Sequence, residues 1–147
     1  MVENIERLII NVDKSDFKTY QNILKNKEWD SNANLQLFTI TVLIGKYIVG
    51  EPTPINSPNT YLRVRDQTKK DNMNILKCFA VIESDDFNIL KNEDAMFTIC
   101  EGYARSGIKK LKEWYDDNNQ YLEDLLSEVL IKKFDENQEK YFNQNNI

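Results

Sequence analysis

Apolar side chains recur at helical spacing along most of the chain, and this pattern predicts a mainly α-helical protein. Ser15 and Asp16 can cap a first helix that runs to about Lys27. A second apolar segment covers about residues 35–47. Its β-branched residues leave a strand as the competing interpretation, but its length favours a helix. The most regular pattern predicts a helix over about 121–141 with an apolar stripe of Leu122, Leu125, Leu126, Val129, Leu130 and Phe134.

The middle of the chain predicts shorter elements. All three prolines lie within residues 50–59, which predicts a rigid, irregular connection. The alternation over 61–65 predicts a short strand. A helix is expected over about 73–83, with Leu76, Phe79 and Ala80 inward and either Val81 or Ile82 beside them.

In the following segment, acidic pairs and a glycine indicate where the helices begin and end. Asp85 and Asp86 can open a short helical turn that ends at Leu90, and a helix is expected over 93–106. Gly107 fits either a C-cap or a kink before a helical stretch over 108–115. Residues 116–119 are expected to break the chain.

Together these elements predict a mainly α fold in one domain, as the length of 147 residues also suggests. We expect a single compact helical domain over residues 1–142 with about five to six helices. A small two-stranded β element near residues 48–65 is expected to accompany them, and residues 143–147 are expected to form a frayed tail.

Composition removes most catalytic chemistry from consideration. The chain contains no histidine, which excludes a Ser-His-Asp triad, a Cys-His pair and a Cys/His zinc site. Four glycines provide little material for a phosphate-binding loop, and no nucleotide or metal motif occurs. The adjacent acidic pairs are better explained as helix caps than as a catalytic pair. We therefore expect no enzyme activity, no cofactor and no metal.

Charge and cysteines indicate the cellular setting. The formal charge of −5 argues against sequence-independent nucleic-acid binding but leaves room for a local basic face. Cys78 and Cys100 lie in segments expected to be helical and apolar, which favours buried free thiols over a disulfide. The N-terminus has no basic region followed by an apolar stretch, and no segment is long enough to span a membrane. We expect a cytoplasmic protein.

Two sets of residues are candidates for binding. Aromatics in polar settings and the C-terminal stripe could bind a protein partner, although each ring could also cover the core edge and the stripe could complete the core. This first set comprises Trp29, Trp114, Tyr115, Leu122, Leu126 and Val129. Two basic groups could contact nucleic acid, with a solvated helix face as the alternative. They comprise Arg63, Arg65, Lys69 and Lys70, and then Arg105, Lys109, Lys110 and Lys112.

The segment from Leu90 to Lys112 resembles the family called Dnd-system-associated protein four. That family carries a Glu-x-Tyr-Ala-Asn-Gly-Gly motif followed by a leucine and a lysine. The matching residues here are Glu101, Tyr103, Ala104, Gly107, Leu111 and Lys112, whereas Arg105 and Ser106 replace Asn and Gly. The family also has a Gly-Lys-Arg-x-Pro-Leu turn. Residues 50–55 share its skeleton, but Glu51 and Pro52 replace the basic pair.

The resemblance covers about residues 17–114, and the helix after Tyr121 is expected to lie outside it. It implies a small, non-catalytic subunit of a bacterial antiphage defence complex, with a larger ATPase or nuclease from the same operon as partner. The loss of the basic pair in the turn weakens any nucleic-acid role carried over from the family. A DNA-contacting regulatory or targeting subunit is the alternative, and a phage-encoded inhibitor ranks last. For the motif itself, Tyr103, Ala104 and Gly107 suit a helix end packed tightly against a neighbour.

Overall fold

A computed structural model of the protein describes residues 4–25, 33–64 and 71–118, together with Ser127, Ile131, Asp135 and Glu136. The chain divides into two compact units, Met1–Lys112 and Glu113–Ile147. The elements below belong to the first unit, apart from the last residues of its final helix. The expected single domain over 1–142 stays a prediction.

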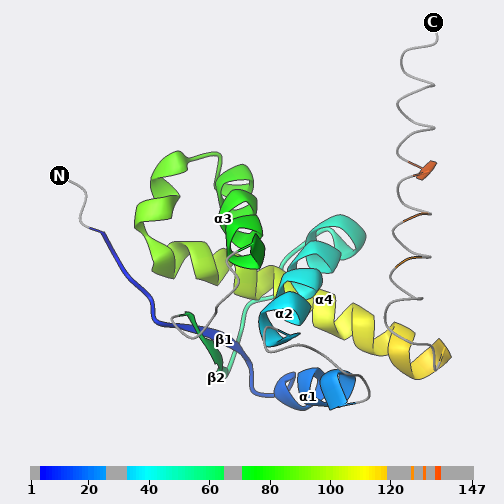
Figure 1. Ribbon diagram of the computed structural model, residues 1–147. Helices are drawn as coiled ribbons and strands as arrows, with labels where there is room; N and C mark the ends of the chain where they lie inside the picture. The colour runs from blue at the N-terminus through cyan, green and yellow to red at the C-terminus, as the bar shows by residue number, and fades with distance from the viewer. Residues whose placement is uncertain are drawn as a thin grey trace, which may run out of the picture. The chain divides into compact units, whose positions relative to one another are not determined.

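Helices form most of the described structure (Figure 1). After strand β1 (Ile9–Asp13) come α1 (Phe17–Lys25), α2 (Ala33–Ile44) and a π-helical segment, η1 (Gly45–Val49). Strand β2 (Pro58–Arg63) precedes α3 (Asp71–Ser84), a 3-10 segment, η3 (Phe87–Lys91), and the long helix α4 (Glu93–Asn118). The mainly helical class is confirmed, with four α-helices in the described part of the chain.

Strands β1 and β2 form a two-stranded antiparallel sheet, with Ile9 opposite Arg63 and Asp13 opposite Pro58. An irregularity between Ile10 and Asn11 shifts the register. The small sheet is therefore confirmed, but its placement near 48–65 was only half right, because the partner strand lies about fifty residues earlier. The proline-rich connection also ends sooner than expected, since Pro58 already belongs to β2.

The core lies between α1, α2, α3, α4 and one side of the sheet. Its largest fully buried side chains are Tyr20, Phe38, Phe97, Ile10, Leu35, Leu37, Leu76, Met96, Ile108, Leu111 and Val42. Eight of the twelve residues of α2 are buried, which explains why its sequence shows no polar face and leaves strand and helix hard to distinguish. The helical interpretation of this segment is confirmed.

Several local predictions were wrong. Gly107 is not a C-cap, because α4 continues through it to Asn118, and the expected break at 116–119 does not occur before that residue. Cys78 is exposed, and only Cys100 is buried. Ile82 is also exposed, whereas Val81 is half-buried. Within the described residues, none of the helices has the length and apolar character that a membrane span requires. The helix predicted over 121–141 falls almost entirely outside the described residues.

Candidate protein-interaction surface

Two glycines allow a close backbone approach between the end of α2 with the start of η1 and the middle of α4. A Cβ on Gly107 would lie 1.7 Å from the backbone oxygen of Thr41, and a Cβ on Gly45 would lie 1.9 Å from the backbone oxygen of Tyr103. Any side chain at either position would therefore force the two backbones apart. Ala104, between Tyr103 and Gly107, is likewise buried. The tight packing expected of the motif is confirmed, although it occurs inside a helix.

Tyr103 joins η1, α3 and α4. Its ring meets Phe79 edge-on at a centroid distance of 5.3 Å, and its hydroxyl donates to the Glu83 carboxylate. Lys46 Nζ lies 2.8 Å from the other oxygen of Glu83 and 5.7 Å from the centroid of the Tyr103 ring. Burial alone would raise the pKa of Glu83, but hydrogen bonds from Lys46 and Tyr103 lower it overall. This contact fixes η1 beside the last turn of α3.

Glu101 joins α4 to the N-terminal strand. Arg7 Nη2 donates to both oxygens of its carboxylate at 2.8 Å, and the Asn11 backbone N–H donates to one of them at 2.6 Å. Burial raises the pKa of Glu101, and the Asn11 and Arg7 contacts oppose that rise. A buried carboxylate with a charged partner and a backbone donor is a satisfied structural group. Glu101 therefore needs no catalytic role to explain its position.

Arg105 and Ser106 hold the proline-rich connection against α4. The Arg105 guanidinium donates to the Pro54 carbonyl and lies 3.5 Å from Asp13 Oδ2 and 3.8 Å from Asp16 Oδ2. The hydroxyl oxygens of Ser106 and Thr53 lie 2.8 Å apart. Both side chains are thus committed to internal contacts.

The surface over α3, η3 and η1 differs from this interior, because large apolar side chains project from it. Phe87 is 79% exposed, Ile82 is 70% exposed and Tyr47 is 55% exposed. We call this region the apolar surface. Its members are Tyr47, Val49, Ile75, Cys78, Ile82, Phe87 and Leu90.

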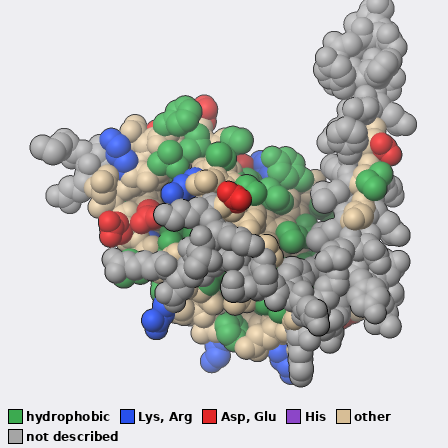
Figure 2. Space-filling view, in the orientation of Figure 1, with side chains coloured by type: hydrophobic (Ala, Val, Ile, Leu, Met, Phe, Trp, Pro, Cys, Tyr) green, Lys and Arg blue, Asp and Glu red, His purple; other side chains and the backbone are tan. Residues whose placement is uncertain are grey.

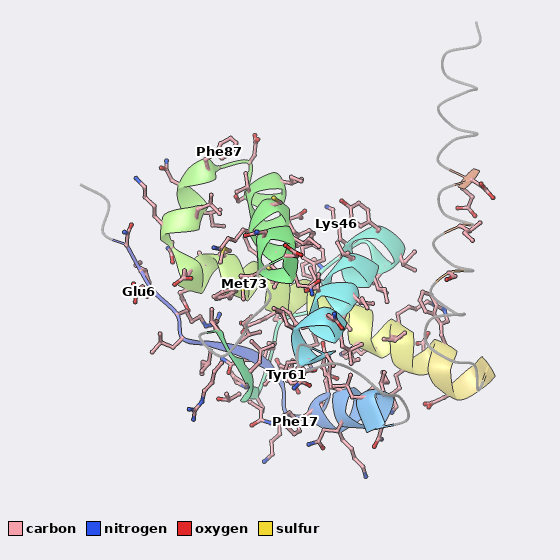
Figure 3. The ribbon with its side chains drawn as sticks, viewed as in Figure 1. Glu6, Phe17, Lys46, Tyr61, Met73 and Phe87 are labelled. Carbon is pink, nitrogen blue, oxygen red and sulfur yellow. The ribbon has the colours of Figure 1, made fainter. Side chains whose placement is uncertain are left out.

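Local geometry places three of these side chains on one helix face and Phe87 at the following corner. Ile75, Cys78 and Ile82 fall at i, i+3 and i+7 on α3 and therefore share one helix face. Asp85 has a positive φ of 54°, which ends α3, and Asp86 then caps η3 by accepting from the Asn88 N–H at 2.9 Å. This corner projects Phe87 outward from the ribbon (Figure 3). Apolar side chains gather over α3 and its neighbours in the space-filling view (Figure 2).

Chemically, this arrangement fits binding better than turnover. Exposed apolar patches of neighbouring side chains typically mark interaction sites, and aromatic anchors dominate binding energies. The described side chains include no group of three or more Cys, Asp or Glu that could hold a metal ion. Sequence reasoning missed this surface, because Phe87 and Ile82 sit in segments whose apolar residues also supply the core. The one available signal was the width of the apolar pattern on α3, which exceeds a single helix face.

The candidates named from the sequence are only partly described. Trp29, Arg65, Lys69, Lys70, Leu122, Leu126 and Val129 lie outside the described residues, as does the side chain of Tyr115. Trp114 and Lys110 are half-buried, whereas Arg63, Lys109 and Lys112 are exposed. Arg105 belongs to the internal ion pairs with Asp13 and Asp16, so its guanidinium is directed inward. The motif residues Glu101, Tyr103, Ala104 and Gly107 are all buried, but they contact different elements: Glu101 faces the N-terminal segment, Tyr103 faces η1 and α3, and Gly107 faces α2.

These features define a small, mainly helical protein with a tightly packed motif helix and an exposed apolar surface. The chain belongs to the family described as DNA sulphur modification system-associated protein 4, which matches residues 54–147. This confirms the resemblance found in the sequence. The match begins later than expected and includes the C-terminal segment that we expected to lie outside it. No curated protein and no solved structure matches the chain.

Proposed function

We propose that this protein is a non-catalytic cytoplasmic subunit that binds a larger component of a DNA sulphur modification system through the apolar surface. The family description associates such proteins with that kind of system, which supports an accessory role. An ATPase or nuclease encoded in the same operon is the partner we favour. The observation that carries the proposal is the exposure of Phe87 and Ile82 at one corner of the fold.

The expected binding energy of this corner is substantial. Complete burial of a Phe or Ile side chain contributes about 1.5–3 kcal/mol relative to leaving it exposed. Because Phe87 and Ile82 are 79% and 70% exposed, they together contribute about 2–4 kcal/mol when a partner covers them. Since about 1.4 kcal/mol corresponds to a tenfold change in affinity, removing both anchors lowers the affinity by at least about thirtyfold.

A co-purification experiment with a matched control tests the proposal. The tagged full chain is expressed with the other proteins of its operon, and we expect one larger component to elute in a fixed ratio. The double variant Ile82→Asn with Phe87→Asn should lose that component. The control, Ile5→Asn with Leu8→Asn, removes two exposed apolar side chains from the N-terminal segment and should retain it. Retention by the first variant, or equal loss by both, would contradict the proposal.

A further inference from the structure

A second surface, on the other half of α4, has the opposite character. Arg105, Lys109 and Lys112 fall at i, i+4 and i+7 and therefore share one face of the helix. The Arg105–Asp16 ion pair at 3.8 Å shows that this face runs along the start of α1. Lys109 and Lys112 are both exposed. Burial raises the pKa of Asp16, and both lysines lie close enough to oppose that rise.

The start of α1 adds two further positive charges. Lys14 lies in the turn before the helix and Lys18 in its first turn, and both are exposed. None of the four lysines forms an ion pair with a described acidic residue. The acidic residues between them, Asp13 and Asp16, are buried and paired with Arg105. The outward charge is therefore positive, and we call Lys14, Lys18, Lys109 and Lys112 the lysine face.

Several exposed acidic residues in the described part of the first unit lie in other segments. Exposed aspartates lie at the start of α3, at its C-terminal corner and in the first turn of α4, namely Asp71, Asp85, Asp86 and Asp94. On α4, the exposed acidic residues Glu113 and Asp116 follow at i+4 from Lys109 and Lys112 and border the positive region at this end. This separation allows a local positive surface on a chain whose net charge is −5. Lys and Arg side chains project along the lower edge of the view in Figure 2, near the sheet and α1.

We propose that the lysine face binds the phosphodiester backbone of double-stranded DNA. Lysine is depleted in protein–protein interfaces, whereas it is a common contact to phosphate oxygens, so this composition favours a polyanionic ligand. Arg105, the one arginine on this face of α4, is held inside, which leaves no guanidinium there to read base edges. Binding is therefore independent of base sequence. The proposal concerns a different surface and a different ligand from the proposed protein partner.

Fluorescence anisotropy with a labelled 20-base-pair duplex and the full chain, between 50 and 200 mM KCl, tests this proposal. Four phosphate contacts predict a slope of log affinity against log salt of about −3 to −4. The variant Lys109→Gln with Lys112→Gln should reduce the size of that slope by about 2. The matched control, Lys77→Gln with Lys91→Gln, changes the net charge equally at exposed lysines of α3 and η3 and should leave the slope unchanged.

Three outcomes would overturn the proposal: no binding at 50 mM KCl, equal loss in both double variants, or displacement of the duplex by polyglutamate at the same charge concentration. The last outcome would identify an acidic protein segment as the ligand. The proposals for the two surfaces can also be refuted separately. The Ile82→Asn, Phe87→Asn variant should bind the duplex normally, and the Lys109→Gln, Lys112→Gln variant should still co-purify with the protein partner.

Discussion

Replacement of Gly107 by alanine tests the central packing contact of the fold. The added Cβ would lie 1.7 Å from the Thr41 backbone oxygen and 2.9 Å from the Gly45 backbone nitrogen. Ordinary van der Waals contacts of carbon atoms lie at about 3.5–4.0 Å. Both opposing atoms belong to the backbone, so no flexible side chain can move aside. The end of α2 must separate from α4 by more than about 1 Å, or α4 must distort locally.

The expected cost follows from two opposing effects. Overpacking a well-packed core costs about 1–3 kcal/mol, and contact with rigid backbone places this site near the upper end. Alanine gains about 1 kcal/mol over glycine inside a helix. The free energy of unfolding should therefore fall by about 2 kcal/mol. For a chain of this length, that loss lowers the melting temperature by about 6 °C.

Gly102→Ala supplies the matched control, because Gly102 lies in the interior of the same helix. Its Cβ would lie 3.2 Å from the Pro52 Cβ, in a connection that can shift by a few tenths of an ångström. The helix-propensity gain should then leave this variant as stable as the wild type or up to about 1 kcal/mol more stable. Urea unfolding followed by circular dichroism at 222 nm compares the two variants. Equal or greater stability of the Gly107→Ala variant would refute the close backbone approach.

Two further predictions concern ionisation and thiol access. Asp13 accepts a hydrogen bond from the Ser15 hydroxyl at 2.7 Å and others from backbone N–H groups, including that of Asn56 at 2.9 Å, and these hold its pKa well below the usual range. Because the folded pKa is depressed, the stabilisation is present above about pH 4 and is lost on acidification below it. Asp13→Asn should therefore lower the free energy of unfolding by about 2 kcal/mol at neutral pH. Unfolding curves should show this difference shrinking below pH 4, and a constant difference would contradict the assignment. A thiol reagent should modify Cys78 alone in the native protein, because Cys100 is buried and burial raises its pKa to about 12. Rapid reaction of both thiols in the native protein would contradict this prediction.

The sequence predicted the helices where local chemistry determines them. Asp86 accepts a backbone hydrogen bond at the start of η3, as expected of an N-cap. Helix α1 begins directly after Asp16, although the Ser15 hydroxyl donates to Asp13 and does not cap the helix. The helical interpretation of α2 is also confirmed. Its apolar run is too long for a typical strand, and length is the main difference between a buried helix and a buried strand in the sequence. These features depend on residues close together in the chain, so a single sequence contains the information.

Features that depend on distant residues were not predictable in this way. The β-branched run of Ile9, Ile10 and Val12 was a signal for a strand, but its pairing with Thr60 and Leu62 joins segments about fifty residues apart. Gly107 was assigned from its usual role at helix ends, whereas its position here is determined by Thr41 on another helix. The apolar surface was likewise hidden, because an apolar residue in a helix does not reveal whether a neighbouring element covers it.

The buried motif limits what the family resemblance can say about function. Glu101, Tyr103, Ala104 and Gly107 all contact the interior of the first unit, so they determine how α4 packs and not what the surface binds. The departures from the family pattern fall into two segments, Glu51–Pro52 and Arg105–Ser106.

The structure places these two segments at one contact. Arg105 donates to the Pro54 carbonyl, the Ser106 hydroxyl meets that of Thr53, and Pro52 packs on Gly102. Three of the four departing residues, Pro52, Arg105 and Ser106, therefore lie at a single internal contact. Because Glu101, Tyr103, Ala104 and Gly107 are buried, we expect any DNA contact of the described residues to come from exposed side chains. The lysine face, which includes the matched residue Lys112, provides such side chains.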